Sequence, residues 1–342
     1  MDLAHLWFWI VAFLFVGYFV LDGFDFGVGM SIPFLGKDDI ARRQIINTIG
    51  PVWDLNETWV IVAGAALFAS FPEWYATLFS GFYLLLLLIL LALIARGVSF
   101  EYRHQGKGVE WTRWFDWMIF VGSVVPAFLW GVAFANITQG LALDENFNYI
   151  GSFFDLLNPY ALLGGLTTLA LFFYHGLVFI TRKTEGEILD RARALALKVG
   201  VLVAVLAITF LGWTVTANFS IAGMMLAMVA VLAFVGSYVG TLLRRDGIAF
   251  ALGALTVATA VLTLFASLFP NLIPNTLDPA NPLTIINGSS SDYTLTIMSW
   301  AALIIVPFVL GYQAWTFWVF RKRISRTMIT GEAPKESAAV AA

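Results

Sequence analysis

The stretch FYLLLLLILLALIA, residues 82–95, decides the class of this fold. It is a continuous apolar run without polar alternation, so it predicts a helix crossing a lipid bilayer and not a strand of a membrane barrel. The whole chain suits that environment: of its 342 residues, 60% are hydrophobic and 12% are charged, and the mean hydropathy is +0.85. A soluble domain carries about 25% charged residues. The sequence therefore predicts an all-α integral membrane protein, because helices satisfy their own backbone polar groups in lipid.

Polar and proline-containing connections divide the rest of the chain into further spans of about 20 apolar residues. The segment 271–293, rich in Pro, Asn and Ser, predicts a loop. The first span lacks a basic leader and a cleavage site, so we interpret it as a retained helix. Residues 1–327 are predicted to form one polytopic transmembrane domain, and 328–342 a disordered cytoplasmic tail. The nine predicted helices are 6–28, 51–70, 77–97, 115–138, 160–181, 196–217, 220–243, 248–269 and 294–320.

The positions of the 19 Lys and Arg residues predict the orientation in the membrane. All of them fall at or after the ends of the first, third, fifth, seventh and ninth predicted helices, and none follows the other four. Because positive residues collect on the cytoplasmic side, the N-terminus is expected outside and the C-terminus in the cytoplasm. Two basic connections, 37–50 and 185–200, are amphipathic and are predicted to form surface helices.

Four acidic residues in or beside the predicted spans are candidate functional residues, because acids are costly inside a bilayer. Asp22 and Asp25 lie near the cytoplasmic end of the first helix, and Asp54 and Glu57 at the cytoplasmic start of the second. Each pair shares a helix face. Neither segment contains a basic residue, and a buried carboxylate without a cation retains a proton more readily. Two interpretations of Asp54 and Glu57 stay open: proton conduction, and capping of a helix N-terminus.

Other polar residues have simpler interpretations. Arg96, Glu101 and Arg103 are expected to pair with one another at the inner end of the third helix, and Asp116 is expected to cap the fourth. His175 predicts either a polar contact between helices or, alternatively, a single haem ligand. The chain has no cysteine, which excludes disulfides and thiolate metal sites. It also has no phosphate-binding loop and no basic groove for nucleic acid.

Gly23 and Gly27 stand one turn apart beside Asp25, within the first predicted helix. Small residues at this spacing let two helix backbones approach closely. The sequence therefore predicts a tight helix–helix contact on this face.

Five motifs together resemble subunit II of cytochrome bd-type quinol oxidases, the smaller subunit, which binds no haem. The resemblance extends over essentially the full length and includes the order and spacing of the motifs. The motifs are YFVLDGFDFGVG (18–29), GPVWDLNETWV (50–60), FPEWYA (71–76), RGVSFEYR (96–103) and HGLVFITRKTEGE (175–187).

This resemblance implies two four-helix bundles plus one peripheral helix, in the cytoplasmic membrane of a bacterium or archaeon. It implies a heterodimer with subunit I, which holds three haems and the quinol site. The complex would oxidise quinol and reduce dioxygen to water with protons from the cytoplasm. No haem, other cofactor or metal is assigned to this chain. A small third subunit, lipid and a structural quinone are further implied partners, although no motif assigns a quinone site.

The resemblance also implies roles for individual residues. Asp54 matches the proton-path aspartate of the second helix, Asp25 matches an assisting aspartate, and Glu57 shares the face of Asp54. Trp59 matches a tryptophan beside an apolar route for oxygen. Leu55 departs from the family, which often has glycine there, and we expect it to alter local packing only.

Two other functions compete with the oxidase hypothesis. A secondary transporter or proton antiporter would also place acids inside its membrane helices, but it would show inverted repeats and a binding cluster near the midplane. The third hypothesis is a structural scaffold whose acids serve only as helix caps.

Overall fold

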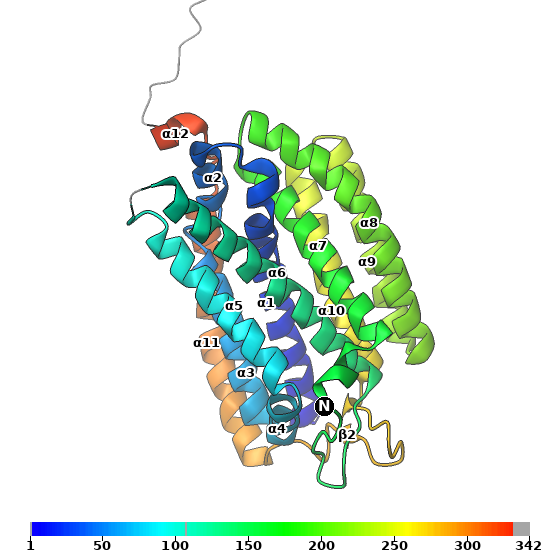
Figure 1. The fold of residues 1–342 in the computed structure, drawn as a ribbon. Coiled ribbons are helices and arrows are strands. Elements are labelled where there is room, and N and C mark those ends of the chain that lie inside the picture. Colours follow the sequence, from blue (N-terminus) through cyan, green and yellow to red (C-terminus); the bar gives the residue numbers. More distant parts are fainter. Residues whose placement is uncertain (1, 107, 331–342) are drawn as a thin grey trace, which may run out of the picture.

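The computed structural model describes residues 2–106 and 108–330, and most of this part is helical (Figure 1). The long helices are α1 (Leu3–Leu35), α3 (Trp53–Ser70), α5 (Tyr83–Tyr102), α6 (Val109–Gln139), α7 (Pro159–Lys183), α8 (Glu187–Ala217), α9 (Ile221–Leu242), α10 (Asp246–Leu268) and α11 (Asp292–Val319). The short elements are α2 (Asp39–Ile46), α4 (Pro72–Gly81), the 3₁₀ helix η1 (Phe153–Leu157), α12 (Arg326–Thr330) and strands β1 (Asn271–Ile273) and β2 (Leu283–Thr284).

Each of the nine predicted spans corresponds to one long helix, and the all-α class is confirmed. Within residues 2–106 and 108–330, eight of these helices are long and apolar enough to cross a membrane. The ninth, α3, has 18 residues, and its first turns carry Asp54, Asn56 and Glu57. The polar start of α3 thus separates it from the other eight, and the count of nine spans stays a prediction.

Several boundaries differ from the sequence prediction. The predicted helix 77–97 is wrong at its start, because the chain turns at Phe82 between α4 and α5. The predicted surface helix 185–200 is not separate but forms the first turns of α8. The segment 37–50 does contain a short surface helix, α2. The predicted loop 271–293 contains the antiparallel pair β1–β2, in which Asn271 faces Thr284.

The end of the chain is only partly described. Helix α12 covers the first residues of the predicted tail 328–342, so residues 328–330 are helical. The remaining residues of that predicted tail, 331–342, lie outside the described part of the chain.

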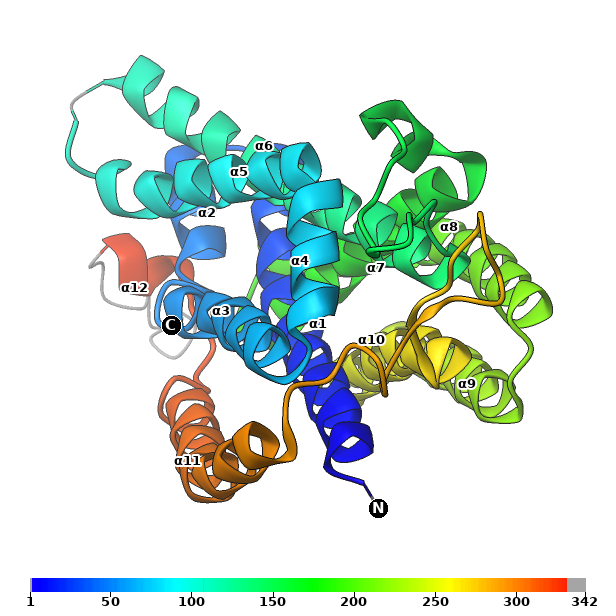
Figure 2. The same cartoon turned by 90° about the horizontal axis from the view of Figure 1, so that it is seen from below.

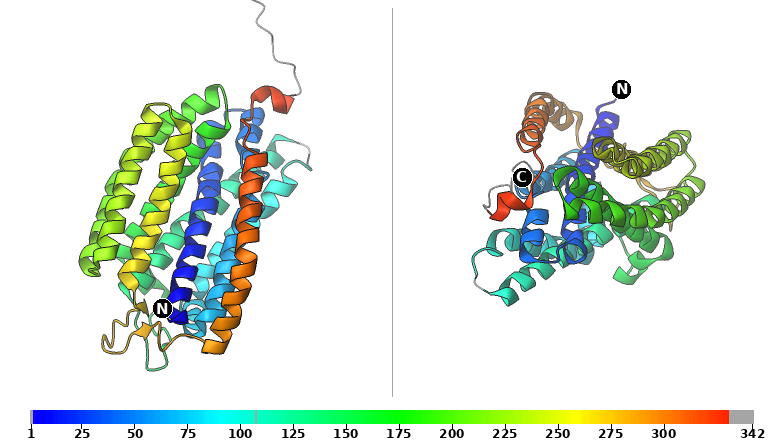
Figure 3. Two further views of the ribbon diagram at one scale, coloured as in Figure 1. Left: turned by 180° about the vertical axis from the view of Figure 1, so that it is seen from behind. Right: turned by 90° about the horizontal axis from the view of Figure 1, so that it is seen from above.

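Helix α1 occupies the centre of the molecule, as the views along the helices show (Figures 2 and 3). It contacts α3, α6, α7, α10 and α11. Around it, α5 packs on α6, α8 on α7 and α9, and α9 on α10. The division into two four-helix bundles and a peripheral helix stays an interpretation, because α1 alone contacts most of the other long helices.

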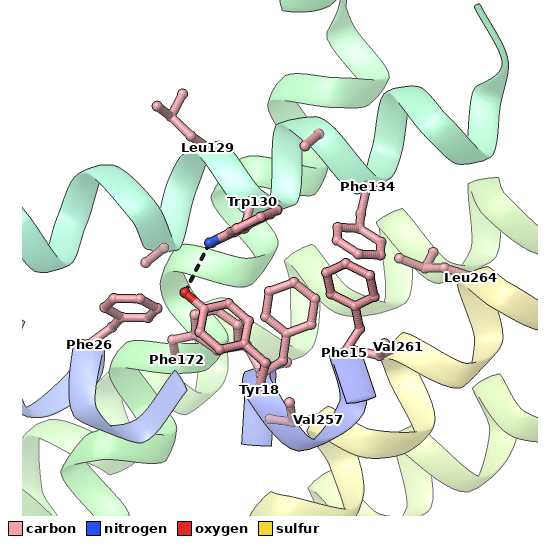
Figure 4. Packing of buried hydrophobic residues seen from close by; sticks show 14 of the residues in the cluster. Phe15, Tyr18, Phe26, Leu129, Trp130, Phe134, Phe172, Val257, Val261 and Leu264 are labelled. Atoms are coloured by element: carbon pink, nitrogen blue, oxygen red, sulfur yellow. Dashed lines mark hydrogen bonds between the residues drawn. The ribbon is translucent and has the colours of Figure 1, made fainter. Parts of the chain in front are cut away.

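Aromatic side chains fill the space between α1 and its neighbours (Figure 4). The Trp130 indole of α6 donates a hydrogen bond to the Tyr18 hydroxyl at 3.1 Å. Phe15 and Phe134 pack edge to face with their ring centroids 5.0 Å apart. Edge-to-face pairs add stability beyond the area they bury. In this aromatic part of the core, the Tyr18 hydroxyl and the Trp130 indole satisfy each other.

Two glycines bring the backbones of α1 and α7 into direct contact. A Cβ atom on Gly27 would lie 2.0 Å from the Phe172 carbonyl oxygen, and one on Gly176 would lie 2.3 Å from the Gly27 carbonyl carbon. Gly23 faces the Phe172 ring. The close packing predicted from Gly23 and Gly27 is confirmed, and Gly176 is its counterpart on α7.

The connections that carry Lys and Arg lie at one end of the molecule, with α2 and α12, and we call this the basic end (Figure 1). Asp116 lies here, two turns inside α6, so the prediction that it caps this helix is wrong. Its carboxylate is 2.6 Å from Arg103 Nε and 3.1 Å from Arg42 Nη1. Asp116 therefore joins α6 to the end of α5 and to α2.

A second group of ion pairs at the basic end holds the segment after α11. Asp246 is 2.8 Å from Arg193 and 2.9 Å from Arg323. Asp38 is 2.9 Å from Arg326, and the Ala41 amide together with Arg326 holds the pKa of Asp38 below its usual range. These pairs join the C-terminal segment to α8, α10 and α2.

Candidate functional site

The Arg96 cluster, which consists of Arg96, Asp22 and Glu57, lies between α5, α1 and α3. Arg96 Nη2 is 2.6 Å from Asp22 Oδ1 and 3.1 Å from Glu57 Oε2. The Arg96 and Asp22 side chains are fully buried, and Glu57 is 20% exposed. The Arg96 guanidinium also lies 4.4 Å from the centre of the Phe26 ring. One buried cation thus joins three helices through two acids.

This cluster corrects two sequence interpretations. Asp22 and Glu57 do not lack a cation, because Arg96 of a third helix provides one. Arg96 therefore does not pair with Glu101, and Arg103 pairs instead with Asp116 and Asp39. The two acidic segments indeed contain no Lys or Arg, but the folded chain brings a cation to them from another helix.

Asp25 belongs to a different set of contacts, the buried polar chain, which consists of Asp25, Asn56, Gln313 and Trp59. Asn56 Nδ2 donates to Asp25 Oδ2 at 2.8 Å. Gln313 Nε2 donates to Asn56 Oδ1 at 2.9 Å, and Trp59 Nε1 donates to Gln313 Oε1 at 3.4 Å. All four side chains are buried. Within the described residues, Asp25 accepts from a neutral amide and makes no ion pair.

Asp54 lies apart from both groups. It occupies the first turn of α3, and its side chain is exposed on the surface of this chain. The residue at the N-cap of α3 is Val52, which makes no side-chain hydrogen bond to the helix. Neither Asp54 nor Glu57 is therefore the N-cap, although Asp54 remains placed to complement the helix dipole. Leu55 beside it is half-buried.

Trp59 packs flat against Gly17 of α1, where a Cβ atom would lie 2.2 Å from the indole ring. The next residue, Val60, lines an apolar cavity of about 90 Å³, together with Leu86, Trp130 and others. A larger apolar cavity of about 290 Å³ lies among α6 to α10. Trp59 is not part of the wall of either cavity, so it borders the first of them only through its neighbour.

His175 makes the contact between helices that one of the two sequence interpretations predicts. Its side chain is fully buried, its Nε2 lies 3.2 Å from the Val20 carbonyl oxygen, and its ring stacks on Phe250 at 5.0 Å. Its Nδ1 faces Gly253 of α10. Both ring nitrogens therefore face protein, Nε2 toward α1 and Nδ1 toward α10. Across residues 2–106 and 108–330, no group of three or more His, Asp or Glu residues could hold a metal ion.

A comparison with known protein families shows in which kind of protein this site occurs. The model of the family described as cytochrome bd terminal oxidase subunit II matches residues 3–320. The chain belongs to this family. The resemblance to subunit II that the five motifs indicate is thereby confirmed.

Individual relatives agree over nearly their whole length. Cytochrome bd ubiquinol oxidase subunit 2 of Bacillus subtilis is 44% identical over 329 residues, which cover 95% of this chain and 97% of the relative. Cytochrome bd-I ubiquinol oxidase subunit 2 of Escherichia coli K12 is 34% identical, covering 95% and 96%. A probable cytochrome oxidase subunit 2 of Haemophilus influenzae is 36% identical, covering 92% and 93%. These relatives are subunits of a respiratory oxidoreductase complex.

The fold is also similar to a chain of the bd oxidase from Geobacillus thermodenitrificans. The TM-score is 0.75 with 17% sequence identity, covering 94% of this chain and 99% of the other. At this identity the likeness concerns the fold. It supports a multi-pass helical membrane fold. The family match over residues 3–320, and not this likeness, favours the oxidase hypothesis over a transporter.

One residue of the site, Gln313, is not predicted from the sequence. The signal that could identify it is a polar side chain within a mostly apolar predicted span, which is also the signal that marks the acids of α1. Arg96 is predicted as an ion-pair residue, but with the wrong partners. Arg96 is buried because α5 is rotated so that this side chain points toward α1.

We expect Arg96→Gln to destabilise the protein by about 3–5 kcal/mol, because it leaves two acids without their buried cation. Adding Asp22→Asn should recover part of this loss, since it removes one of the unpaired charges. The measurement is thermal unfolding of the purified complex of this chain with subunit I. The control is Arg244→Gln, which changes an exposed arginine. An Arg96→Gln protein as stable as the control would contradict this role of Arg96.

Proposed function

We propose that this chain is the non-haem subunit of a cytochrome bd-type quinol:oxygen oxidoreductase. In this proposal it stabilises the haem-bearing subunit I, contributes to proton delivery from the cytoplasm, and borders an oxygen route. The observation that carries the proposal is the set of buried polar groups near the basic end of α1 and α3. An apolar bundle keeps such groups when they serve a function, because each one is costly in lipid.

Asp25 is the acid best suited to exchange a proton. Its Oδ1 has no hydrogen-bond partner among the described residues, and its Oδ2 accepts only from the Asn56 amide. Asp22 Oδ2 and the Arg96 atoms Nε and Nη1 are likewise buried without a protein partner. Buried polar atoms usually bond to protein or to ordered water. Four such atoms close together favour a hydrated route past Asp25.

Asp54 contributes from the surface of the chain. It shares one exposed stripe of α3 with Thr58, Ile61, Ala65 and Phe68. Residues at this spacing lie on one helix face. A stripe that is apolar apart from a single acid and a hydroxyl at one end suits a membrane partner. We assign this stripe to subunit I, so that Asp54 would pass protons between the two chains.

Helix α11 extends the same docking surface. It lies beside α3, and among its residues only Leu295, Gln313 and Thr316 are buried. Trp300 and Phe308 are 64% and 76% exposed. Helix α11 is thus joined to the bundle mainly at its ends and through Gln313. Subunit I would cover part of this face and lipid the rest.

The remaining features of the proposal concern ligands and position. Haems are assigned to subunit I, and a structural quinone and a small third subunit stay proposed partners. The basic end is proposed to face the cytoplasm, with nine spans in the plasma membrane. Trp59 is proposed to border the oxygen route, supported by the apolar cavity that Val60 lines.

Asp25→Asn and Asp54→Asn should each slow quinol-driven oxygen uptake by roughly tenfold or more, since a positioned proton-transfer group contributes about 100-fold or more to a rate. The complex should still assemble with its full haem content. The matched control is Glu73→Gln, an exposed acid in the first turn of α4 at the opposite end. Turnover and charge movement equal to those of the control would exclude a relay role.

On the proposed oxygen route, Trp59→Ala should lower the apparent KM for oxygen, because it removes the bulky indole that fills the space against Gly17 of α1. The measurement is oxygen uptake at low oxygen, with the half-exposed Trp213→Ala on α8 as control. An unchanged KM in the Trp59 variant would argue against an oxygen route at this residue.

Subunit I produced without this chain should lose haem, because the docking surface on α3 and α11 would no longer support it. Haem is quantified from the visible spectrum of purified subunit I, and restoring this chain on a plasmid is the control. Full haem content and activity without the chain would contradict the stabilising role.

A further inference from the structure

A third cavity, at the basic end, is unlike the two apolar ones. It has a volume of about 250 Å³ and lies where α7, α10 and α11 meet the connection between α2 and α3. Three of its nine lining residues are cations, four are phenylalanines and none is an acid. We call it the basic-end pocket, and its lining residues are Thr48, Val52, Phe179, Arg182, Lys183, Phe250, Phe317, Phe320 and Arg321.

The three cations of this pocket have no acidic partner in the described part of the chain. The nearby acid Asp246 is held by Arg193 and Arg323 instead. Lys183 donates to the main-chain carbonyls of Phe320 and Lys322, which are neutral. An uncompensated group of three positive charges attracts an anion, and low-dielectric walls strengthen this attraction.

The two arginines rest on aromatic rings rather than on acids. The Arg182 guanidinium carbon is 5.9 Å from the centre of the Phe250 ring, and that of Arg321 is 4.5 Å from the Trp318 ring. Arg321 also donates to the Trp318 carbonyl oxygen at 2.6 Å. These contacts hold the guanidinium groups beside the pocket and leave further N–H donors for a ligand.

The phenylalanines decide which kind of anion fits. Phe179, Phe250 and Phe317 belong to α7, α10 and α11, so apolar surface from three membrane helices lies next to the cations. A free phosphate ion would use the cations only. A phospholipid would use both, with its phosphate at the cations and its glycerol and first methylene groups on the rings. Basic pockets between membrane helices on the cytoplasmic side commonly bind anionic lipid headgroups.

We propose that the basic-end pocket binds the phosphate group of an anionic phospholipid from the adjacent leaflet. The lipid would join the end of α11 to α7 and α10, where the protein itself provides only the Lys183 contacts and the Asp246 pairs. This ligand is separate from the proton and oxygen routes.

The test uses the purified complex of this chain with subunit I in neutral detergent, titrated with phosphatidylglycerol and followed by native mass spectrometry. Arg182→Gln/Arg321→Gln should weaken binding roughly 30-fold, since each basic residue contributes about 1 kcal/mol to attraction of an anionic lipid. The matched control is Arg244→Gln/Arg245→Gln, which removes two exposed charges at the same end but outside the pocket. Equal binding by both variants overturns the proposal.

Three further arms test the assignment to an anionic phospholipid and need no variant. Phosphatidylcholine should bind much more weakly than phosphatidylglycerol, and inorganic phosphate should not displace the lipid. Displacement by inorganic phosphate at comparable concentration would overturn the assignment to a lipid. A photoreactive phosphatidylglycerol, with its diazirine near the glycerol, should label peptides containing Phe250 or Phe317 in the unmodified complex. Labelling confined to other peptides would also overturn it.

Discussion

The positive charge of Arg96 inside an apolar helical bundle is the constraint on which the rest of the structure depends. An uncompensated guanidinium in this position would be strongly destabilising, so the fold must bring acids to it. Asp22 comes from α1 and Glu57 from α3, and both reach the same nitrogen of Arg96. The relative rotation of α1, α3 and α5 is thereby fixed. Hydrophobic contacts between lipid-facing helices would not specify this rotation, because lipid is as apolar as the side chains themselves.

This constraint divides the acids of the site into three kinds. Asp22 and Glu57 are held as counter-ions, Asp25 bonds to a neutral amide, and Asp54 lies on the surface. In the proposed function, Asp22 and Glu57 serve mainly to hold the helices together, and Asp25 and Asp54 exchange protons. The motifs that contain these acids all lie in the region that the subunit II family model matches. The role proposed for each acid thus follows from its bonding partners and not from its position in the membrane alone.

The sequence predicts the helical segments well, because a long apolar run is a local property. It also identifies Asp25, Asp54 and Trp59 as unusual residues and Gly27 as a contact site. It does not predict the partners of Arg96, because Asp22 lies 74 residues and Glu57 39 residues away along the chain. Gln313 is 257 residues from Asn56, and only the assembled fold brings the two amides together. Which side chains meet depends on helix rotation and on the turn at Phe82, and neither is encoded in a local pattern.

The two ends of the molecule are held by different chemistry. Ion pairs such as Asp38–Arg326 gather at the basic end, whereas the opposite end relies on amides, for example Asn136 to the Leu156 carbonyl and Asn218 to the Thr138 carbonyl. Dissolved ions screen exposed charges but leave bonds between neutral groups intact. High salt would therefore weaken the exposed ion pairs at the basic end and leave the amide hydrogen bonds at the opposite end intact. Extraction buffers of low ionic strength should preserve the ion pairs that hold the segment after α11.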